Sequence, residues 1–372
     1  MTKAISCKDA AVQWGISQRR VVKLCGEGRI PGATQVGNMW IIPADAPKPS
    51  DSRYVGQADD TAPGTAKPFI KWAGGKGQLL DEIRAYYPFD GANITRYVEP
   101  FVGGGAVLFD VLNRYNLQEI IINDVNNALT NVYSAIQVDV DSLIAQLQVM
   151  HDKFIPLTQV ERDKYYMDRR DEFNRGMEAG HEVSIRQAAL MIFINKTCFN
   201  GLYRVNSKGE YNVPPGKYAT PLICAQDNLR RVAEKLQNVK ITCGDYKEME
   251  SLIDEHTFVY FDPPYRPLTT SSSFIAYAKS GFGDPEQKQL VDFFRKVTYK
   301  GAKALLSNSD PKNADVNDNF FDDLYADFII RRVSASRMIN SKAERRGKVN
   351  ELLISNFAPC NSGELPFAET AE

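Results

Sequence analysis

Short apolar runs alternate with segments of helical periodicity from Phe69 onward, and this alternation restricts the fold more than any other feature of the chain. The runs are rich in β-branched and aromatic residues, which favour strands. Strands that alternate with helices predict a mostly parallel sheet with helices on both faces, which is an α/β fold. The strand-like runs are residues 96–99, 120–123, 239–242, 258–261, 304–307 and 328–331.

A helical segment interrupts this alternation, and residues 185–194 are its clearest part. We therefore expect an insertion at about residues 127–236 inside a sheet domain that spans residues 67–358. Within the insertion, residues 199–217 predict a β-hairpin whose tip is Asn206-Ser207-Lys208-Gly209. A ribbon of two strands is narrow enough to enter the major groove of DNA.

Residues 1–50 form a basic segment in a chain whose formal net charge is only −1. They hold seven Lys or Arg and three Asp or Glu. Two short helical patterns meet at Gly15, and a pair of strands around residues 38–43 follows. This arrangement resembles the winged helix-turn-helix heads of excisionase and MerR-type proteins. The resemblance implies DNA contacts from the second helix, by Arg19, Arg20 and Lys23. A helical module that binds protein or packs on the main body is the alternative.

Two segments flank the sheet domain and lack a hydrophobic period. Residues 51–66 are rich in Pro, Gly, Asp, Ser and Thr, which is typical of a linker. Residues 359–372 are expected to form a flexible tail.

The cysteine pattern and the hydropathy exclude several classes of protein. The six cysteines are scattered without a C-x-x-C pair, and only three histidines could join them, so we expect neither a disulfide framework nor a metal site. No apolar run reaches the ~18 residues that span a bilayer. We therefore expect a cytoplasmic, DNA-associated protein that makes no membrane contact and is a monomer in solution.

A glycine-rich loop, residues 99–105, lies between a predicted strand and an apolar helix. Its glycines let the backbone approach a ligand where a helix N-terminus presents free N–H groups. Asp124 ends the next strand, where an α/β sheet places a carboxylate for ribose hydroxyls. The loop lacks the full G-x-G-x-x-G spacing of a dinucleotide site. These features predict a cofactor that contains adenosine, with a bare structural turn as the alternative.

The sequence Asp262-Pro263-Pro264-Tyr265 follows the apolar run 258–261 directly. Two successive prolines fix φ twice and contribute no N–H, so the loop is stiff and its carbonyls remain free to accept hydrogen bonds. Asp262 and the Pro263 carbonyl can each accept a hydrogen bond from an exocyclic amine and orient its lone pair for in-line attack. Tyr265 can stack on a base that has been flipped out of the duplex.

Five blocks in this order resemble the Dam-type N6-adenine DNA methyltransferases of the D12 class, alpha group, and the resemblance covers about residues 69–357. The blocks are residues 69–76, 99–105, 123–124, 200–206 and 262–265. The resemblance implies a Rossmann-like methyltransferase sheet, S-adenosyl-L-methionine as cofactor, and double-stranded DNA as partner. The cofactor-site residues are expected to be Trp72, Lys76, Phe101, Gly103, Gly105, Asp124, Asp245, Tyr246 and Asp262.

Two segments are expected to bind the DNA. Residues 331–348 hold seven Lys or Arg and one Glu, which suits phosphate, and their Ser, Asn and Gly content predicts a flexible loop between strands. The expected phosphate contacts come from Arg331, Arg332, Arg337, Arg345, Arg346 and Lys348.

The base contacts are expected on the hairpin, where the fork of Arg204 suits a guanine edge. Phe199 and Asn200 would fill the gap left by the flipped adenine, and Leu202 would touch a thymine methyl. By resemblance, Lys71 matches a residue used on the first guanine, so the implied target is GATC. Tyr203 and Pro215 depart from the family's residues, which leaves the outer bases open. The sequence also leaves open whether a cognate restriction endonuclease is a partner.

Four alternatives differ in their chemistry. Methylation of cytosine N4 uses the same reaction, but its loop more often begins with Ser, so Asp262 favours adenine. A C5-cytosine enzyme needs a nucleophilic Cys after a strand, whereas Cys360 lies in the tail. Protein-glutamine methylases use Asn in place of this Asp and need no basic groove. A helix-turn-helix regulator on an inactive methylase fold is opposed by the intact set of cofactor residues.

Overall fold

The computed structural model describes residues 4–14, 18–26, 30–37, 39–44, 46, 64–91, 93–176, 183–266, 282–336 and 348–360. The chain forms two compact units, residues 1–62 and 63–372. Arg337, Arg345, Arg346, the side chains of Arg20, Lys23 and Lys348, most of the expected linker and all but the first two residues of the tail lie outside the described residues.

The first unit holds two helices packed on a small antiparallel sheet of order β1-β3-β2. Ser6 caps the first helix through its hydroxyl, which accepts the N–H of Asp9 at 3.3 Å. The core joins both helices to the sheet through Trp14, Val21, Leu24 and Ile42. The elements are β1 (Ala4–Ser6), α1 (Cys7–Trp14), α2 (Gln18–Gly26), β2 (Thr34–Val36) and β3 (Met39–Pro43).

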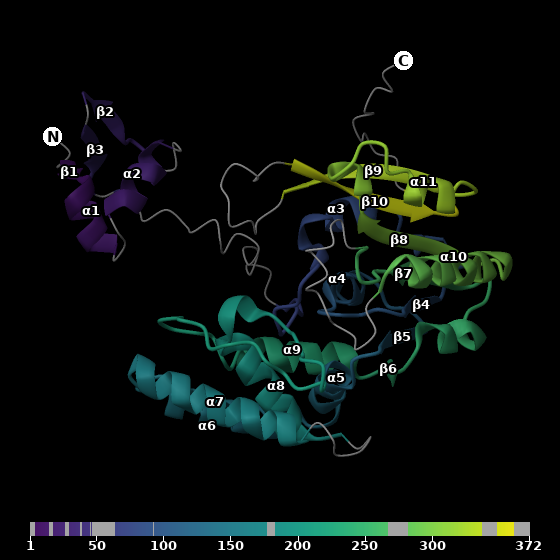
Figure 1. Cartoon of the computed structure of the whole chain (residues 1–372), viewed down its shortest axis with the longest axis horizontal. Coiled ribbons are helices and arrows are strands. Elements are labelled where there is room, and N and C mark those ends of the chain that lie inside the picture. Colours follow the sequence, from purple (N-terminus) through teal and green to yellow (C-terminus); the bar gives the residue numbers. More distant parts are fainter. Residues whose placement is uncertain are drawn as a thin grey trace. The chain divides into compact units, whose positions relative to one another are not determined.

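The second unit is built on a sheet of seven strands in the order β6-β5-β4-β7-β8-β10-β9 (Figure 1). The five strands from β6 to β8 pair in parallel, and β10 runs antiparallel between β8 and β9. The prediction of a mostly parallel sheet is therefore confirmed. The strands are β4 (Arg96–Glu99), β5 (Glu119–Asp124), β6 (Val239–Cys243), β7 (Thr257–Phe261), β8 (Lys303–Ser309), β9 (Ile329–Ser336) and β10 (Lys348–Ser355).

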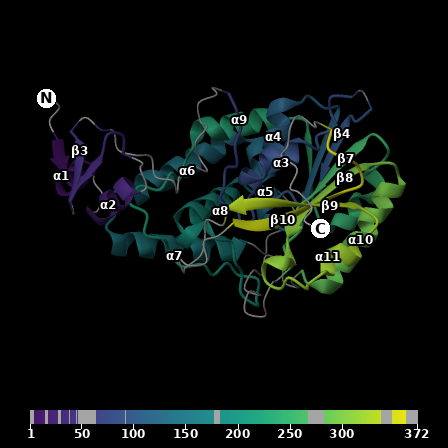
Figure 2. The same cartoon turned by 90° about the horizontal axis from the view of Figure 1, so that it is seen from above.

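Helices cover both faces of this sheet, because alternate strand residues enter different cores. Phe258 and Tyr260 of β7 pack in one core, with α3 and α4, whereas Val259 and Phe261 pack in the other, with α10 and α11. Figure 2 shows the two helix layers on either side of the strands. The helices are α3 (Leu80–Arg84), α4 (Ala106–Arg114), α10 (Asp284–Tyr299) and α11 (Phe320–Leu324).

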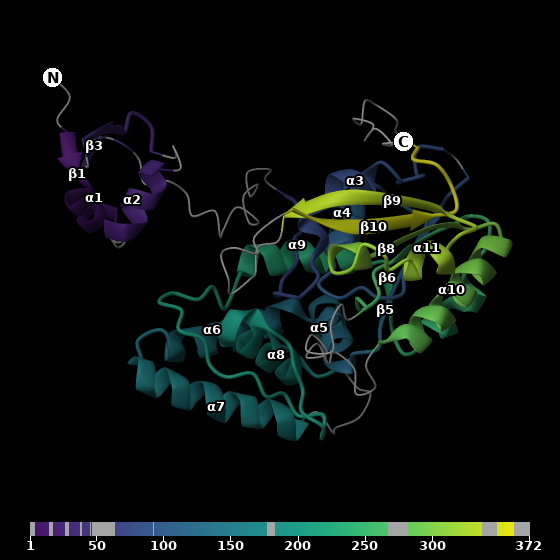
Figure 3. The same ribbon diagram turned by 45° about the horizontal axis from the view of Figure 1, so that its top comes forward.

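A group of helices follows β5 before the chain returns to the sheet at β6, and α6, α7 and α8 lie side by side in it (Figures 1 and 3). Helix α8 is buried over nine of its thirteen residues, which makes it the centre of the group. None of the helices in the described ranges is long and apolar enough to cross a bilayer. The helices are α5 (Asn127–Val138), α6 (Val140–Phe154), α7 (Gln159–Gly176), α8 (Ile185–Thr197) and α9 (Gln226–Leu236).

The basic segment 331–348 differs from the expected loop. Strand β9 continues to Ser336, and β10 begins at Lys348. The two strands pair over eight residues, and Val333 is buried in the core, so hydrophobic burial holds the first part of the segment in the sheet. The expectation of a loop is wrong for residues 331–336.

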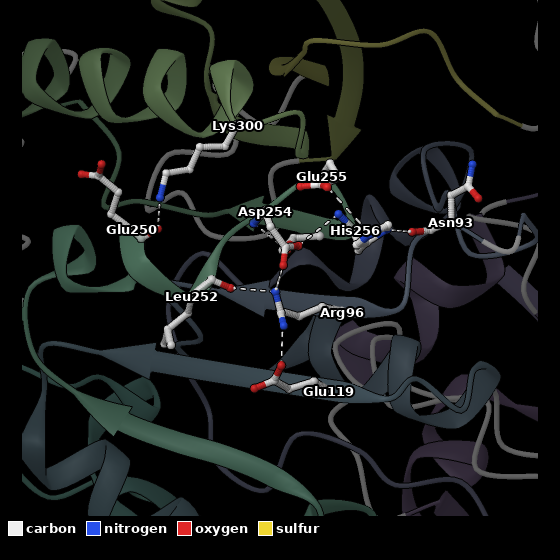
Figure 4. Close-up of polar contacts among 10 residues, drawn as sticks. Asn93, Arg96, Glu119, Glu250, Leu252, Asp254, Glu255, His256 and Lys300 are labelled. Atoms are coloured by element: carbon white, nitrogen blue, oxygen red, sulfur yellow. Dashed lines mark hydrogen bonds and ion pairs between the residues drawn. The ribbon is translucent and has the colours of Figure 1, made fainter.

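Arg96 ties together the amino ends of three neighbouring strands (Figure 4). Its guanidinium donates to Glu119 and Asp254, each at 2.6 Å, and to the Leu252 carbonyl at 3.2 Å. Nearby, a ring nitrogen of His256 lies 2.9 Å from the Asn93 carbonyl. These contacts hold the amino end of β7, whereas Asp262 follows its carboxyl end. None of the residues in this network lies at the carboxyl ends of the strands, where the candidate site is found.

Candidate active site

Two loops meet at the carboxyl ends of β4 and β7, which are neighbours in the sheet. From β4 the sheet extends through β5 to β6, and from β7 it extends in the other direction through β8. Such a reversal opens a crevice at the carboxyl ends of the strands, where α/β proteins bind ligands. The glycine loop leaves β4 and the sequence Asp262-Pro263-Pro264-Tyr265 leaves β7, so both predicted loops lie at this crevice.

The glycine loop needs its glycines for two physical reasons. Gly103 and Gly105 have φ values of +48° and +74°, which side chains other than glycine rarely adopt. A Cβ atom on Gly103 or Gly104 would lie 3.0 Å from the Trp72 side chain, and one on Gly105 would lie 2.5 Å from the Tyr133 hydroxyl. The loop therefore packs closely on Trp72 and leads into α4.

Asp124 closes the other side of the glycine loop from the end of β5. Its carboxylate accepts the N–H of Gly103 at 3.1 Å and the N–H of Asn126 at 2.9 Å. Burial raises the pKa of Asp124 to about 6, although those two N–H groups act in the opposite direction. A carboxylate held in this way can still accept hydrogen bonds from ribose hydroxyls through its remaining lone pairs.

Phe101 and Tyr246 supply an aromatic wall, with ring centroids 5.1 Å apart. The Tyr246 hydroxyl is buried and has no hydrogen-bond partner among the described residues. Asp245, directly before it, caps the helical turn η4 (Tyr246–Leu252) by accepting the N–H of Lys247 at 2.9 Å. An aromatic wall, a buried hydroxyl that is unpaired among the described residues, and the carboxylate of Asp124 are groups that could contact an adenosine.

Lys76 is buried beside Asp262, with its Nζ 2.6 Å from Asp262 Oδ1 and 2.7 Å from the Gly74 carbonyl. An ammonium has three donors, and its contacts with the described residues use two of them, so the third could donate to a ligand. The Nζ also lies 4.6 Å from the centroid of the Tyr265 ring. Burial raises the pKa of Asp262, and the charge of Lys76 opposes this effect.

The residues of the loop after β7 are held one by one. The Ser307 hydroxyl donates to Asp262 Oδ1 at 3.2 Å, and the Gln287 amide donates to the Pro264 carbonyl at 3.1 Å. The Tyr265 hydroxyl donates to Glu351 of β10 at 2.5 Å. Arg266 forms ion pairs of 2.6 Å with both Asp284 and Asp318. Sequence reasoning missed Ser307, Gln287, Glu351 and Arg266 as parts of the site, because no local motif marks them.

Two acceptors of this loop remain unpaired among the described residues. Both contacts of Asp262 fall on Oδ1, and neither its Oδ2 nor the Pro263 carbonyl accepts a hydrogen bond there. A primary amine carries two protons, so the pair suits an amine that enters the crevice. In the same described ranges, no three His, Cys, Asp or Glu side chains gather as a metal ion would require.

The expected hairpin is an irregular ribbon, which we define as residues 198–215. It has two isolated bridges, Cys198 with Pro215 and Val205 with Tyr211. Phe199 and Leu202 are exposed at 52% and 37%. Asn200 adopts a left-handed conformation with a φ of +56°. The guanidinium of Arg204 donates to Asn212 Oδ1 at 2.7 Å and to the Asn212 carbonyl at 3.3 Å, so its fork is oriented from within the ribbon.

A second cation lies beside Lys71 and was not predicted. Burial lowers the pKa of Lys196 to about 8, and the charge of Lys71 adds to this effect. Lys71 itself lies over the ring of Tyr218, with its Nζ 4.5 Å from the ring centroid. Lys71 and Lys196 therefore both bring positive charge to the start of the ribbon.

The basic residues of β9 are already paired within the protein. Arg331 lies 3.3 Å from Glu82, and Arg332 lies 2.9 Å from Asp310 and 2.8 Å from Asp322. These carboxylates neutralise the two guanidinium groups that the sequence assigned to phosphate.

In the first unit, Arg19 is exposed.

Comparison with known proteins gives a consistent result. The profile of the D12 class N6 adenine-specific DNA methyltransferases matches residues 72–339. The type II methyltransferase M.MjaIII of Methanocaldococcus jannaschii is 47% identical over 294 residues, which cover 78% of this chain and 99% of that protein. The DNA adenine methylase of Haemophilus influenzae is 34% identical, over 77% of this chain and 92% of that protein. The DNA N-6-adenine-methyltransferase of Escherichia phage P1 is 31% identical, over 91% of this chain and 43% of that protein.

Proposed function

Because this chain belongs to the D12 class N6 adenine-specific DNA methyltransferases, we propose that it transfers a methyl group from S-adenosyl-L-methionine to the exocyclic N6 of an adenine flipped out of double-stranded DNA. The observation that carries the proposal is the pair of acceptors, Asp262 Oδ2 and the Pro263 carbonyl, that are unpaired among the described residues and lie at the carboxyl ends of the strands with Trp72, Asp124 and the glycine loop.

The cofactor supplies an electrophilic methyl group on a sulfonium. Lys76 would hold its carboxylate, Asp124 its ribose, and Phe101 with Tyr246 its adenine. Asp262 and the Pro263 carbonyl would accept hydrogen bonds from the two N–H groups of N6 and so direct the nitrogen lone pair toward the methyl group. The amine keeps one of these protons and releases the other to solvent as it gains the methyl group. Ser307 and Lys76 fix the orientation of the Asp262 carboxylate, and Gln287 fixes the Pro264 peptide.

Tyr265 is suited to stack on the extruded adenine, because the hydrogen bond of its hydroxyl to Glu351 favours one orientation of the ring. Stacking fixes the position of the base, so N6 is held within hydrogen-bonding distance of Asp262 and the Pro263 carbonyl.

Transfer of tritium from labelled cofactor to short duplexes tests the proposal. We expect counts in an unmethylated duplex with one GATC, and nucleoside digestion should place the label in N6-methyladenine. A duplex with the same composition and a scrambled site is the control. Label in N4-methylcytosine, or none in DNA, would contradict the proposed reaction.

The raised pKa of Asp124 predicts a pH-dependent affinity for the cofactor. The ionised carboxylate is the better acceptor for ribose hydroxyls, so affinity for S-adenosylhomocysteine should be constant above about pH 7. It should fall as the pH drops through about 6. Calorimetric titration of the wild type and of Asp124→Asn measures this. The variant should lose the pH dependence, whereas Asp139→Asn, at an exposed helix cap, should retain it. A flat wild-type profile would refute the prediction.

The target site is proposed to be GATC, read by the ribbon. Arg204→Ala should lower the free energy of discrimination between the correct and an incorrect base at one base pair by about 1–3 kcal/mol. Alanine cannot make the bidentate hydrogen bonds to guanine. Arg204→Lys keeps the charge without the fork, so it should lose discrimination but keep affinity. The measurement is kcat/KM on GATC and on duplexes changed at each position. Unaltered selectivity in both variants would show that Arg204 does not read the site.

The first unit is proposed to be a DNA-binding head whose second helix carries Arg19. Deletion of residues 1–50 should leave a folded enzyme that still binds cofactor, because the unit has its own hydrophobic core. DNA affinity should fall, and the slope of log affinity against log salt should become shallower by about one for each phosphate that the head neutralises. An insoluble truncation, or one with an unchanged salt slope, would contradict this assignment.

A further inference from the structure

Tyr203 belongs to the ribbon, yet its side chain packs against residues of the cofactor site. Its ring centroid is 5.2 Å from that of Trp72, with 32° between the ring planes. Only 6% of Tyr203 is exposed. Burial raises the pKa of Tyr203. The Tyr203 ring is therefore enclosed within the protein beside Trp72.

Trp72 also packs against the glycine loop. A Cβ atom at Gly103 or Gly104 would lie 3.0 Å from the indole side chain, so the loop and the indole are in close contact. Tyr203, Trp72 and the glycine loop thus form one packed row from the ribbon to the cofactor site. A displacement of the indole would have to move the Tyr203 ring as well.

Asn195 makes a second and independent link. It is fully buried, and its side-chain oxygen accepts the N–H of Lys71 at 2.8 Å. Its amide group donates to the Lys71 carbonyl at 2.8 Å and to the Gly201 carbonyl at 3.1 Å. One buried amide therefore joins the backbone next to Trp72 to the backbone at the start of the ribbon.

We propose that the ribbon and the cofactor site form one coupled unit, in which Tyr203 and Asn195 are positioning residues that make the binding of cofactor and the reading of DNA depend on each other. The inference rests on the proposed function. Both ligands require the same arrangement of Trp72, Tyr203 and the Lys71 backbone, so the first to bind orders that arrangement for the second. The effect must be reciprocal, because the coupling is an equilibrium property.

The test measures the dissociation constant of S-adenosylhomocysteine alone and with saturating unmethylated GATC duplex, and takes the ratio of the two. We expect the duplex to tighten binding of this ligand by about tenfold or more in the wild type. Tyr203→Ala should reduce the ratio to within about twofold of one. Tyr203→Phe keeps the ring on Trp72 and should retain most of the ratio. Asn195→Asp replaces an amide that donates to two backbone carbonyls with a carboxylate that can only accept. This variant should therefore also lower the ratio.

Tyr166→Phe is the matched control. The Tyr166 hydroxyl donates to the Val213 carbonyl at 2.8 Å, so it supports the ribbon from α7 and not from the cofactor site. This variant should bind DNA more weakly but keep the wild-type ratio. Melting temperatures identify variants that fail to fold, and Tyr203→Leu replaces Tyr203→Ala in that case.

Three results would overturn the inference alone, and the first two are a wild-type ratio of one and a wild-type ratio retained in folded Tyr203→Ala. Equal loss of the ratio in Tyr166→Phe would also overturn it, because the ribbon's stability would then explain the effect. A wild-type chain that fails to bind S-adenosylhomocysteine would instead overturn the proposed function, and the inference with it.

Discussion

Asp262→Ala should lose at least about a hundredfold in kcat while its DNA affinity stays near the wild-type value. The carboxylate acts on the target amine and contacts no phosphate, so its removal affects the chemical step and not docking. Lys76 would also lose the partner that lies 2.6 Å away, which disorders the cation expected to hold the cofactor. Single-turnover methylation and a DNA-binding titration on the same preparation separate the two effects.

Asp254→Ala provides a matched control at the other end of β7. Asp254 pairs with Arg96 at the amino ends of the strands, so its loss should lower stability but leave kcat intact (Figure 4). Asp262→Asn should fall between the wild type and Asp262→Ala, because the amide keeps one acceptor without the charge. An Asp262→Ala variant that retains a tenth of the wild-type kcat would refute the role of this residue.

Lys76→Met should lower kcat/KM at pH 7 by about a hundredfold or more, because it leaves a buried carboxylate without its cation. Burial raises the pKa of Asp262 and Lys76 opposes that rise, so the variant should have a still higher Asp262 pKa. Catalysis needs the ionised carboxylate, and activity is lost as the pH falls through its pKa. The acid limb of the kcat profile should therefore move to higher pH in the variant.

Single-turnover rates across the pH range measure that shift. Lys240→Met, at an exposed position on β6, is the control and should leave the profile unchanged. When cofactor is saturating at every pH, the pH dependence of the single-turnover rate does not change through loss of cofactor affinity alone. An acid limb at the wild-type pH in Lys76→Met would show that the ion pair does not set the protonation of Asp262.

Six of the seven strands of the sheet and the two loops at the strand ends were predicted, because their signals are local, whereas β10 was not among the predicted strand runs. The run 258–261 and the prolines after it are contiguous in sequence, and so are the glycines that follow β4. Glu351 was not predictable, since its partner Tyr265 lies 86 residues away and only the pairing of β10 with β8 brings them together. The same holds for Gln287, which lies 23 residues from Pro264.

The charge of residues 331–348 was visible in the sequence, but its pairing was not. If residues 331–348 formed a loop, Arg331 and Arg332 would both be free to contact phosphate. Strand β9 instead places Arg332 against Asp310 and Asp322, and Arg331 beside Glu82. A count of charges in a sequence therefore overstates the number available for phosphate wherever the fold supplies carboxylates as partners.

Whether the Asp262 loop methylates N6 of adenine within GATC can be decided by one experiment in cells. The full chain and its Asp262→Ala variant are expressed separately in a host free of DNA methylation, and the host DNA is sequenced by a single-molecule method that detects modified bases. We expect N6-methyladenine at GATC sites with the wild type and none with the variant. Modified cytosine, unmodified DNA with the wild type, or equal methylation with the variant would contradict the proposed reaction.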